Sequence, residues 1–405
     1  MPMSYPLQNG LQFDDESDEQ DVAERITSGT VAAVVSGTDW TTETIVSQLK
    51  RKNIQLRPRF QRRDAWKRDR KSRFIESLIV GLPIPQIVLA ESKQDRGKFM
   101  VLDGKQRLLA ILQYWGMAEG ENNAYALSGV TLRDDLKGIS FKKLSSDPSY
   151  ESDFNALCNQ PIRTVVIRNW KDTNFLHTVF LRLNTGSVSL SPQELRQALL
   201  PGPFSDYVDD ATGNDDVLQR LLGLNGPDPR MRDIEIFARF IAFRFFVRGY
   251  PGRMKQFLDN TFEHMNLHWN EEQTSVTAAK NEFDLGIEQL LQIFGPEIAR
   301  KPGSPQFNRA IFDALIFYHS QPEIRNALTG KRKDVNKAYS ALFVPGSEFS
   351  RSIESDTAGT PNTQARLKIW GETLSAIAER PITIPTITHL QASEKPQRSR
   401  KPKRQ

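Results

Sequence analysis

The chain has 405 residues, of which 38% are hydrophobic and 25% charged, so it holds enough apolar material for two domains with separate cores. No apolar run approaches the length of a membrane span, and the amino terminus lacks the pattern of a secretory signal, which argues against a membrane partner and favours a cytoplasmic protein. The one cysteine, Cys158, excludes an internal disulfide and a cysteine-ligated zinc site.

The formal net charge of +5 is concentrated at the carboxyl terminus. Residues Ser393 to Gln405 contain six cations and one acid, so the rest of the chain is close to neutral. We expect this proline-punctuated tail, within residues 381–405, to be disordered, and either to contact DNA or another acidic surface or only to keep the chain soluble. The cations that would contact DNA are Lys395, Arg398, Arg400, Lys401, Lys403 and Arg404.

Residues 1–39 are acidic and poor in aromatic side chains, which predicts a mostly disordered segment. Residues 40–200 then alternate the period of amphipathic helices with that of short strands, which predicts a mixed α/β domain. Only a polar turn separates the second and third expected strands, so we expect these two to be adjacent. The helices are expected at 43–49 and 70–80, and the strands at 54–56, 84–90, 98–102 and 162–168.

The segment Arg57–Arg73 is strongly cationic, with nine cations and two acids. By composition it fits any polyanion, and most of its side chains are equally consistent with a solvated face. Gln61 and Arg62 are the exceptions that we single out, because they lie close to the aromatic residues Phe60 and Trp66.

The turn after the third strand reads Asp103-Gly104-Lys105-Gln106-Arg107 and opens a helix. We expect Asp103 to cap this helix by accepting its first backbone N–H groups, and Gly104 to let another group approach the backbone. Lys105 and Arg107 then lie at the positive end of the helix dipole, where a cation is unfavourable unless an anion is also bound. The turn therefore predicts either a phosphate site or an N-cap followed by two solvated cations.

The rest of the chain is expected to be mainly helical. A helix over 173–183 would be closed by Asn184-Thr185-Gly186, and Ser191 to Glu194 has the spacing of a capping box at the start of the next helix. Strand patterns are absent beyond about residue 200, so residues 201–380 predict an all-helical domain. Its helices are expected at 234–247, 253–268, 278–294, 307–319 and 364–378.

Several of these motifs, taken in order, resemble the amino-terminal domain of GmrSD-type restriction systems. That family resembles the ParB and sulfiredoxin fold, which implies an α+β fold with a ParB-like mixed domain followed by the helical one. The resemblance covers roughly residues 40–375, and its motifs are Phe60-Gln61-Arg62, Trp66, Ser77 to Pro85, Asp103 to Leu108, Phe180 to Gly186, Leu190 to Arg196 and Asp233 to Phe240.

The resemblance implies nucleotide binding, with Mg²⁺-dependent hydrolysis of a nucleoside triphosphate as the further activity, in prokaryotic defence against foreign or modified DNA. Arg107 and Arg62 would hold phosphate oxygens by forked charge-assisted bonds, beside Gly104 and Lys105 at the helix start. The family usually has Asp-Gly-Gln-Gln-Arg, so Lys105 departs from its pattern and leaves open whether hydrolysis is retained.

The remaining candidate residues have alternatives that the sequence leaves open. Gln61 or Gln106 would orient a sugar, a base or a water molecule. Asp103 would bind Mg²⁺ and support hydrolysis, orient an arginine, or cap the helix. Asn184 and Glu194 would complete the site, or else only close one helix and cap the next.

We recognise no nuclease centre, so the leading hypothesis is a nucleotide-binding regulatory protein whose nuclease is a separate chain. Two other functions fit the same residues. One is a non-enzymatic ParB-like DNA-binding module that uses Arg57–Arg73 and the tail, and the other is an interaction scaffold whose working surface is the helical domain.

Overall fold

The computed structural model describes residues 33–56, 66–93, 95–118, 124–170, 175, 176, 179 and 191–388. The chain divides between Glu235 and Ile236 into two compact units, which we call the sheet unit and the helical unit, and residues 220–223 belong to the helical unit. The division lies later than residue 200, where the sequence placed the end of the mixed domain. No helix in the described part of the chain is long and apolar enough to cross a membrane.

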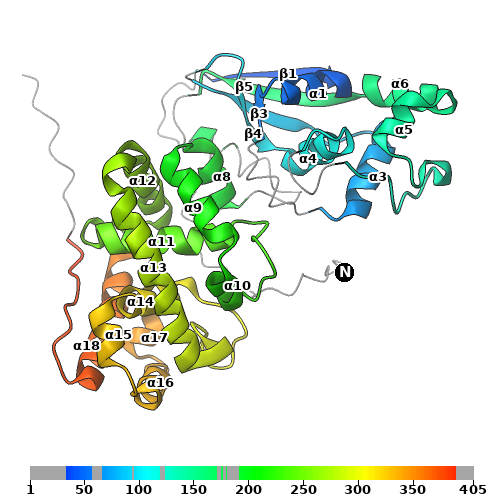
Figure 1. Cartoon of the computed structure of the whole chain (residues 1–405). Coiled ribbons are helices and arrows are strands. Elements are labelled where there is room, and N and C mark those ends of the chain that lie inside the picture. The colour runs from blue at the N-terminus through cyan, green and yellow to red at the C-terminus, as the bar shows by residue number, and fades with distance from the viewer. Residues whose placement is uncertain are drawn as a thin grey trace, which may run out of the picture. The chain divides into compact units, whose positions relative to one another are not determined.

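The sheet unit is built on a five-stranded sheet in the order β1-β5-β3-β4-β2. Strand β5 pairs antiparallel with β1 and parallel with β3, and β4 pairs antiparallel with β3 and parallel with β2. Figure 1 shows β1, β5, β3 and β4 in this succession. The strands are β1 Val34–Thr41, β2 Ile54–Gln55, β3 Ile87–Glu91, β4 Phe99–Asp103 and β5 Pro161–Arg168.

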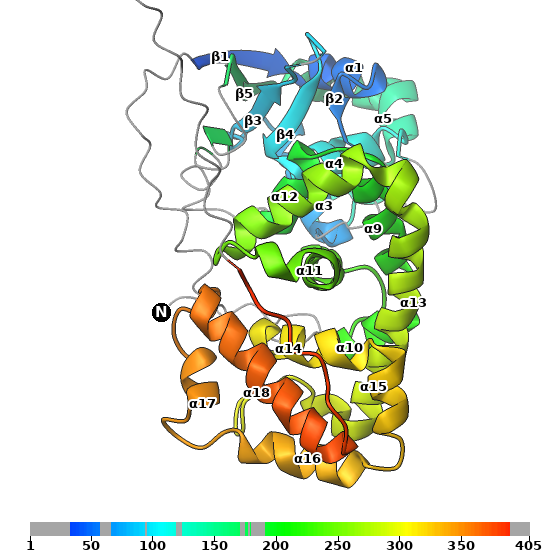
Figure 2. The same ribbon diagram turned by 90° about the vertical axis from the view of Figure 1, so that its left-hand side faces the viewer.

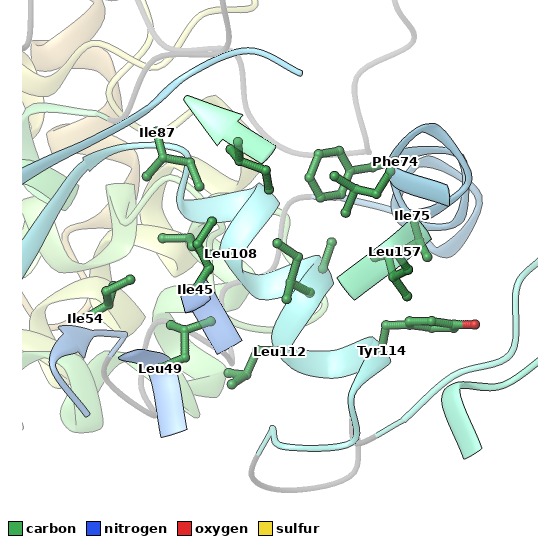
Figure 3. Packing of buried hydrophobic residues seen from close by; sticks show 14 of the residues in the cluster. Ile45, Leu49, Ile54, Phe74, Ile75, Ile87, Leu108, Leu112, Tyr114 and Leu157 are labelled. Carbon is green, nitrogen blue, oxygen red and sulfur yellow. The ribbon is translucent and has the colours of Figure 1, made fainter. Parts of the chain in front are cut away.

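One face of this sheet carries the larger core. Alternate residues such as Leu89 and Val101 pack there against helices. Figure 3 shows Leu108 and Leu112 of the central helix, α4, among side chains of the other helices and strands. All the residues of that helix except Gln106 are buried, so it forms the centre of the unit. The helices that contribute to this core are α1 Thr42–Lys50, α3 Arg68–Ile79, α4 Lys105–Tyr114, α5 Phe141–Ser146 and α6 Glu151–Asn159.

The opposite face of the sheet carries a smaller core. Val88 and Leu102 face this side, where Leu195 of α8 Pro192–Leu199 packs against them. This contact keeps α8 with the sheet. The sheet unit continues through α9 Pro203–Gly213, and the division between the units passes through α10 Asp216–Leu222 and α11 Arg232–Phe246.

The mixed α/β class and the adjacent strands β3 and β4 confirm the expectation from sequence, whereas two regions differ from it. Strand β1 begins at Val34, inside the segment 1–39 that we expected to be mostly disordered, because an eight-residue pairing with β5 orders it. Residues 116–160, where we expected no particular helix or strand, contain α5 and α6. The helix expected at 173–183 lies largely outside the described residues.

The helical unit confirms the helices expected beyond residue 230. In it α14 packs against both α13 and α18, and α16 and α17 pack against α18 (Figure 2). The helices that follow α11 are α12 Met254–Leu267, α13 Trp269–Phe294, α14 Arg309–His319, α15 Pro322–Ala327, α16 Arg332–Ala341, α17 Glu348–Ser352 and α18 Thr360–Ala378.

Candidate functional site

The turn between β4 and α4 begins with an irregularity in the sheet. Val88 pairs with Asp103 but Leu89 pairs with Val101, so Leu102 is an extra residue on β4. Such a bulge increases the local twist and changes the direction in which the next side chain leaves the strand. Here it precedes Asp103, the last residue of the strand.

Gly104, and not Asp103, is the N-cap residue of α4, which corrects the expectation from sequence. Its backbone is left-handed, with φ of 95°, and the helix has no side-chain cap. Among the backbone N–H groups of the described residues, the Asp103 carboxylate accepts only that of Gly104, through Oδ1 at 2.7 Å, and so does not reach the N–H groups of the first turn. The reason is conformational: the left-handed turn needs glycine at the cap position and leaves the aspartate in the strand.

Arg107 is held inside this turn. Its Nη2 donates to Asp103 Oδ2 at 2.8 Å and to the backbone carbonyl of Gln86 at 2.9 Å, and the residue is only 8% exposed. Within the part of the chain that the structure describes, the buried Nε has no acceptor. A Cβ at Gly104 would lie 3.4 Å from this Nε and 3.0 Å from Cγ1 of Ile87. Because Gly104 has no side chain, the backbone of the turn lies directly beside the guanidinium.

Lys105 makes a buried ion pair across the unit. Its Nζ lies 3.0 Å from Oε1 of Glu194, and the two side chains are 5% and 4% exposed. Glu194 also completes the capping box predicted at the start of α8, since Ser191 N–H donates to its Oε2 and Ser191 Oγ accepts the Glu194 N–H. The pair connects the first turn of α4 to the first turn of α8.

Gln106 makes a second connection from the same helical turn. Its Oε1 accepts the backbone N–H of Trp66 at 3.2 Å. The Trp66 ring packs edge-on against Phe74, and the guanidinium of Arg70 lies 4.7 Å above it. Trp66 lies within the cationic segment Arg57–Arg73, so its bond with Gln106 connects that segment to the first turn of α4.

The structure thus brings together Asp103, Gly104, Lys105, Gln106, Arg107 and Glu194. Gln61, Arg62 and Asn184 lie outside the described residues, as do the six tail cations Lys395, Arg398, Arg400, Lys401, Lys403 and Arg404. Sequence reasoning missed the carbonyl of Gln86 and the guanidinium of Arg230, whose Nε lies 3.8 Å from Glu194 Oε2. No local pattern could have found either one, because both reach the site through tertiary contacts.

This arrangement can bind an anion. A helix start without a side-chain cap presents N–H groups and the positive end of the dipole, and Arg107 adds a guanidinium. Asp103 already accepts two hydrogen bonds, and the described residues contain no group of three or more acidic, histidine or cysteine side chains that could hold a metal ion.

One comparison with known proteins matches part of the chain. Residues 43–201 match the family model for the N-terminal domain of the GmrSD restriction endonuclease. This range includes the turn at Asp103, the cationic segment Arg57–Arg73 and the capping box at Ser191. No curated protein and no solved structure shows significant similarity to the chain.

Proposed function

We propose, from the premise that residues 43–201 carry a GmrSD restriction endonuclease N-terminal domain, that this protein binds and hydrolyses a nucleoside triphosphate. In this proposal it is a regulatory component of a restriction-like defence system, its mixed domain is ParB-like, and a separate chain supplies the nuclease. The binding site is the turn from Asp103 to Arg107.

The observation that supports this proposal best is the state of Arg107. A guanidinium that is more than nine-tenths buried is expected to use all its donors, yet its Nε has no acceptor in the described structure. It lies beside the one residue of the turn that has no side chain, at the start of a helix. A phosphate oxygen placed there would accept from Nε and from the helix N–H groups together.

The charges of the turn indicate that further cations take part. Asp103 is paired with Arg107, and Glu194 with Lys105, so these four charges cancel. A triphosphate therefore needs further cations: Arg230 lies beside Glu194, and the segment 57–65 directly before Trp66 carries several more. We propose that Arg62 supplies the second forked contact to phosphate, with Gln61 beside it, and that Asn184 contacts the nucleotide from the segment before α8.

The catalytic step of the proposal uses Gln106 and Asp103. Because Gln106 accepts the Trp66 N–H through Oε1, its Nε2 amide is the group that would orient a water molecule or a sugar hydroxyl. Asp103 holds Arg107 in place, and a Mg²⁺ ion bound to the triphosphate would supply neutralisation of the phosphate charge. Asp103→Asn is then expected to slow hydrolysis; a wild-type rate in a phosphate-release assay would limit Asp103 to a structural role.

Calorimetric titration of the purified chain with the four ribonucleoside triphosphates tests the binding. Arg107→Ala removes a charge-assisted contact of about 1.5–3 kcal/mol, so the affinity should fall at least about tenfold. The control is Arg133→Ala in the same unit, whose guanidinium pairs with Asp135 and Asp153 away from the turn. Equal affinities for wild type and Arg107→Ala would remove Arg107 from the site.

Duplex DNA forms the second arm of the same titration. Saturable nucleotide binding supports the proposal. Binding of DNA that is indifferent to nucleotide, with no nucleotide binding, would instead favour the DNA-binding module considered above.

A further inference from the structure

We propose that Lys105 is a positioning residue, whose buried ion pair with Glu194 holds the start of α4 in the geometry that the phosphate requires. This inference rests on the proposed function and assigns Lys105 a role through Glu194, in place of a direct contact with nucleotide. The alternative, in which the Lys105 ammonium touches phosphate, makes opposite predictions.

The ammonium group of Lys105 lies in a buried ion pair. Lys105 and Glu194 are about equally buried, and the Nζ to Oε1 distance of 3.0 Å is that of a direct charge-assisted bond. Removing one partner of a buried ion pair is strongly destabilising, because the charge that remains loses its direct bond. A phosphate that drew Lys105 away from Glu194 would meet the same penalty.

The Glu194 carboxylate is also held in place by contacts that do not involve Lys105. Its Oε2 accepts the Ser191 N–H at 2.7 Å, and Arg230 Nε lies 3.8 Å from the same oxygen. Ser191 Oγ in turn donates to the carbonyl of Arg230 at 2.7 Å. An acceptor held by its own helix cap and by the loop before α11 can fix the position of a partner.

Lys105 also lies at a position from which it can fix the turn. It is the first residue of α4 and follows the left-handed Gly104. The next two residues are Gln106, which contacts Trp66, and Arg107, which contacts Asp103. An anchor here limits how far the first turn of α4 can rotate or fray. A site that depends on helix N–H groups loses affinity when the groups are displaced, because their contribution falls off within the first turn.

The experiment is a double-mutant cycle on the full chain with Lys105→Gln, Glu194→Gln and the double variant. The probe is whichever ribonucleoside triphosphate binds the wild type most tightly. Each single variant should weaken its binding at least tenfold and lower the melting temperature by more than about 6 °C. The double variant should recover most of both losses, because two amides can form a hydrogen bond without a buried charge.

The direct-contact alternative predicts a different pattern. Glu194→Gln would release the ammonium and leave binding unchanged or tighter, while Lys105→Gln and the double variant would both be weak. This pattern would overturn the proposal, and so would wild-type affinity in all three variants.

A matched buried pair in the helical unit provides the control. Arg239 Nη2 lies 2.6 Å from Asp313 Oδ2, and the side chains are 3% and 9% exposed. Arg239→Gln and Asp313→Asn should lower the melting temperature without changing the nucleotide affinity. A loss of affinity here as well would show that the readout follows stability alone, and would overturn the proposal.

Amide hydrogen exchange over residues 104–108 separates this inference from the proposed function, because it needs no nucleotide. Exchange in the two single variants should be faster than in the wild type and in the double variant. If the wild type binds no nucleotide, the proposed function fails, and the exchange rates still decide whether the pair positions the turn. Unchanged exchange in the single variants contradicts the positioning role.

Discussion

Replacing Gly104 by alanine separates two demands that this position places on the residue. Any other residue at φ of 95° meets the strain of left-handed backbone, about 1–2 kcal/mol. The new Cβ would also lie 3.0 Å from Cγ1 of Ile87, and such overpacking in a buried turn adds about 1–3 kcal/mol. We therefore expect Gly104→Ala to lower the free energy of unfolding of the sheet unit by about 2–5 kcal/mol.

Gly138 provides the matched control. It has a similar left-handed φ of 82°, but nothing lies within 4 Å of the Cβ that alanine would add. Gly138→Ala should therefore cost about 1–2 kcal/mol, the strain alone. Calorimetric melting measures both losses, at about 2–4 °C per kcal/mol for a unit of this size. Nucleotide affinity should fall only in Gly104→Ala, whose methyl group lies against the Arg107 guanidinium. Equal destabilisation by the two substitutions would refute the crowding argument.

Three further predictions concern pH and salt. Burial alone would raise the pKa of Glu76, but hydrogen bonds from the N–H groups of residues 131–133 outweigh this effect and hold the pKa below 4.5. Glu76→Gln should therefore lower the midpoint of urea unfolding at pH 7. The difference from wild type should disappear as the pH falls well below 4.5. Burial, and secondarily Arg325, lowers the pKa of His319 to about 3, so the native ring stays neutral while the unfolded ring is protonated below 6.5. Stability should fall by about 1.4 kcal/mol per pH unit between these values in acid titrations, and His319→Gln should flatten that slope. Deleting Ser393–Gln405 should reduce the log–log salt slope of any DNA binding by at most about 5 and weaken all sequences alike, as fluorescence anisotropy would show.

The elements that sequence predicted best are those that depend on neighbouring residues. The helix α1 and the strand β5 follow from the period of their own apolar side chains, and the capping box at Ser191 follows from a three-residue spacing. Strand β1 could not be found in this way. Its pattern is weak, and its order comes from pairing with β5 more than 120 residues away.

The candidate site shows the same limit. From the composition of the turn at Asp103 we expected either a phosphate site or an N-cap followed by two solvated cations, because a cation is unfavourable at the positive end of the helix dipole. The choice of Asp103 as the cap was wrong, since side-chain preference for the cap position says nothing of a left-handed backbone. The partner of Lys105 was out of reach of any local pattern, because Glu194 lies 89 residues later in the chain.

The extra residue on β4 constrains the length of the chain as well as its composition. Because side chains alternate between the two faces of a sheet, deleting Leu102 would remove the bulge and leave Asp103 opposite Val88 but directly after Val101, so its side chain would take the place of Leu102 on the face of the smaller core. Insertions and deletions between Val101 and Arg107 should therefore destabilise the sheet unit. The turn between β3 and β4 is the place where a peptide tag or a loop graft should be accepted.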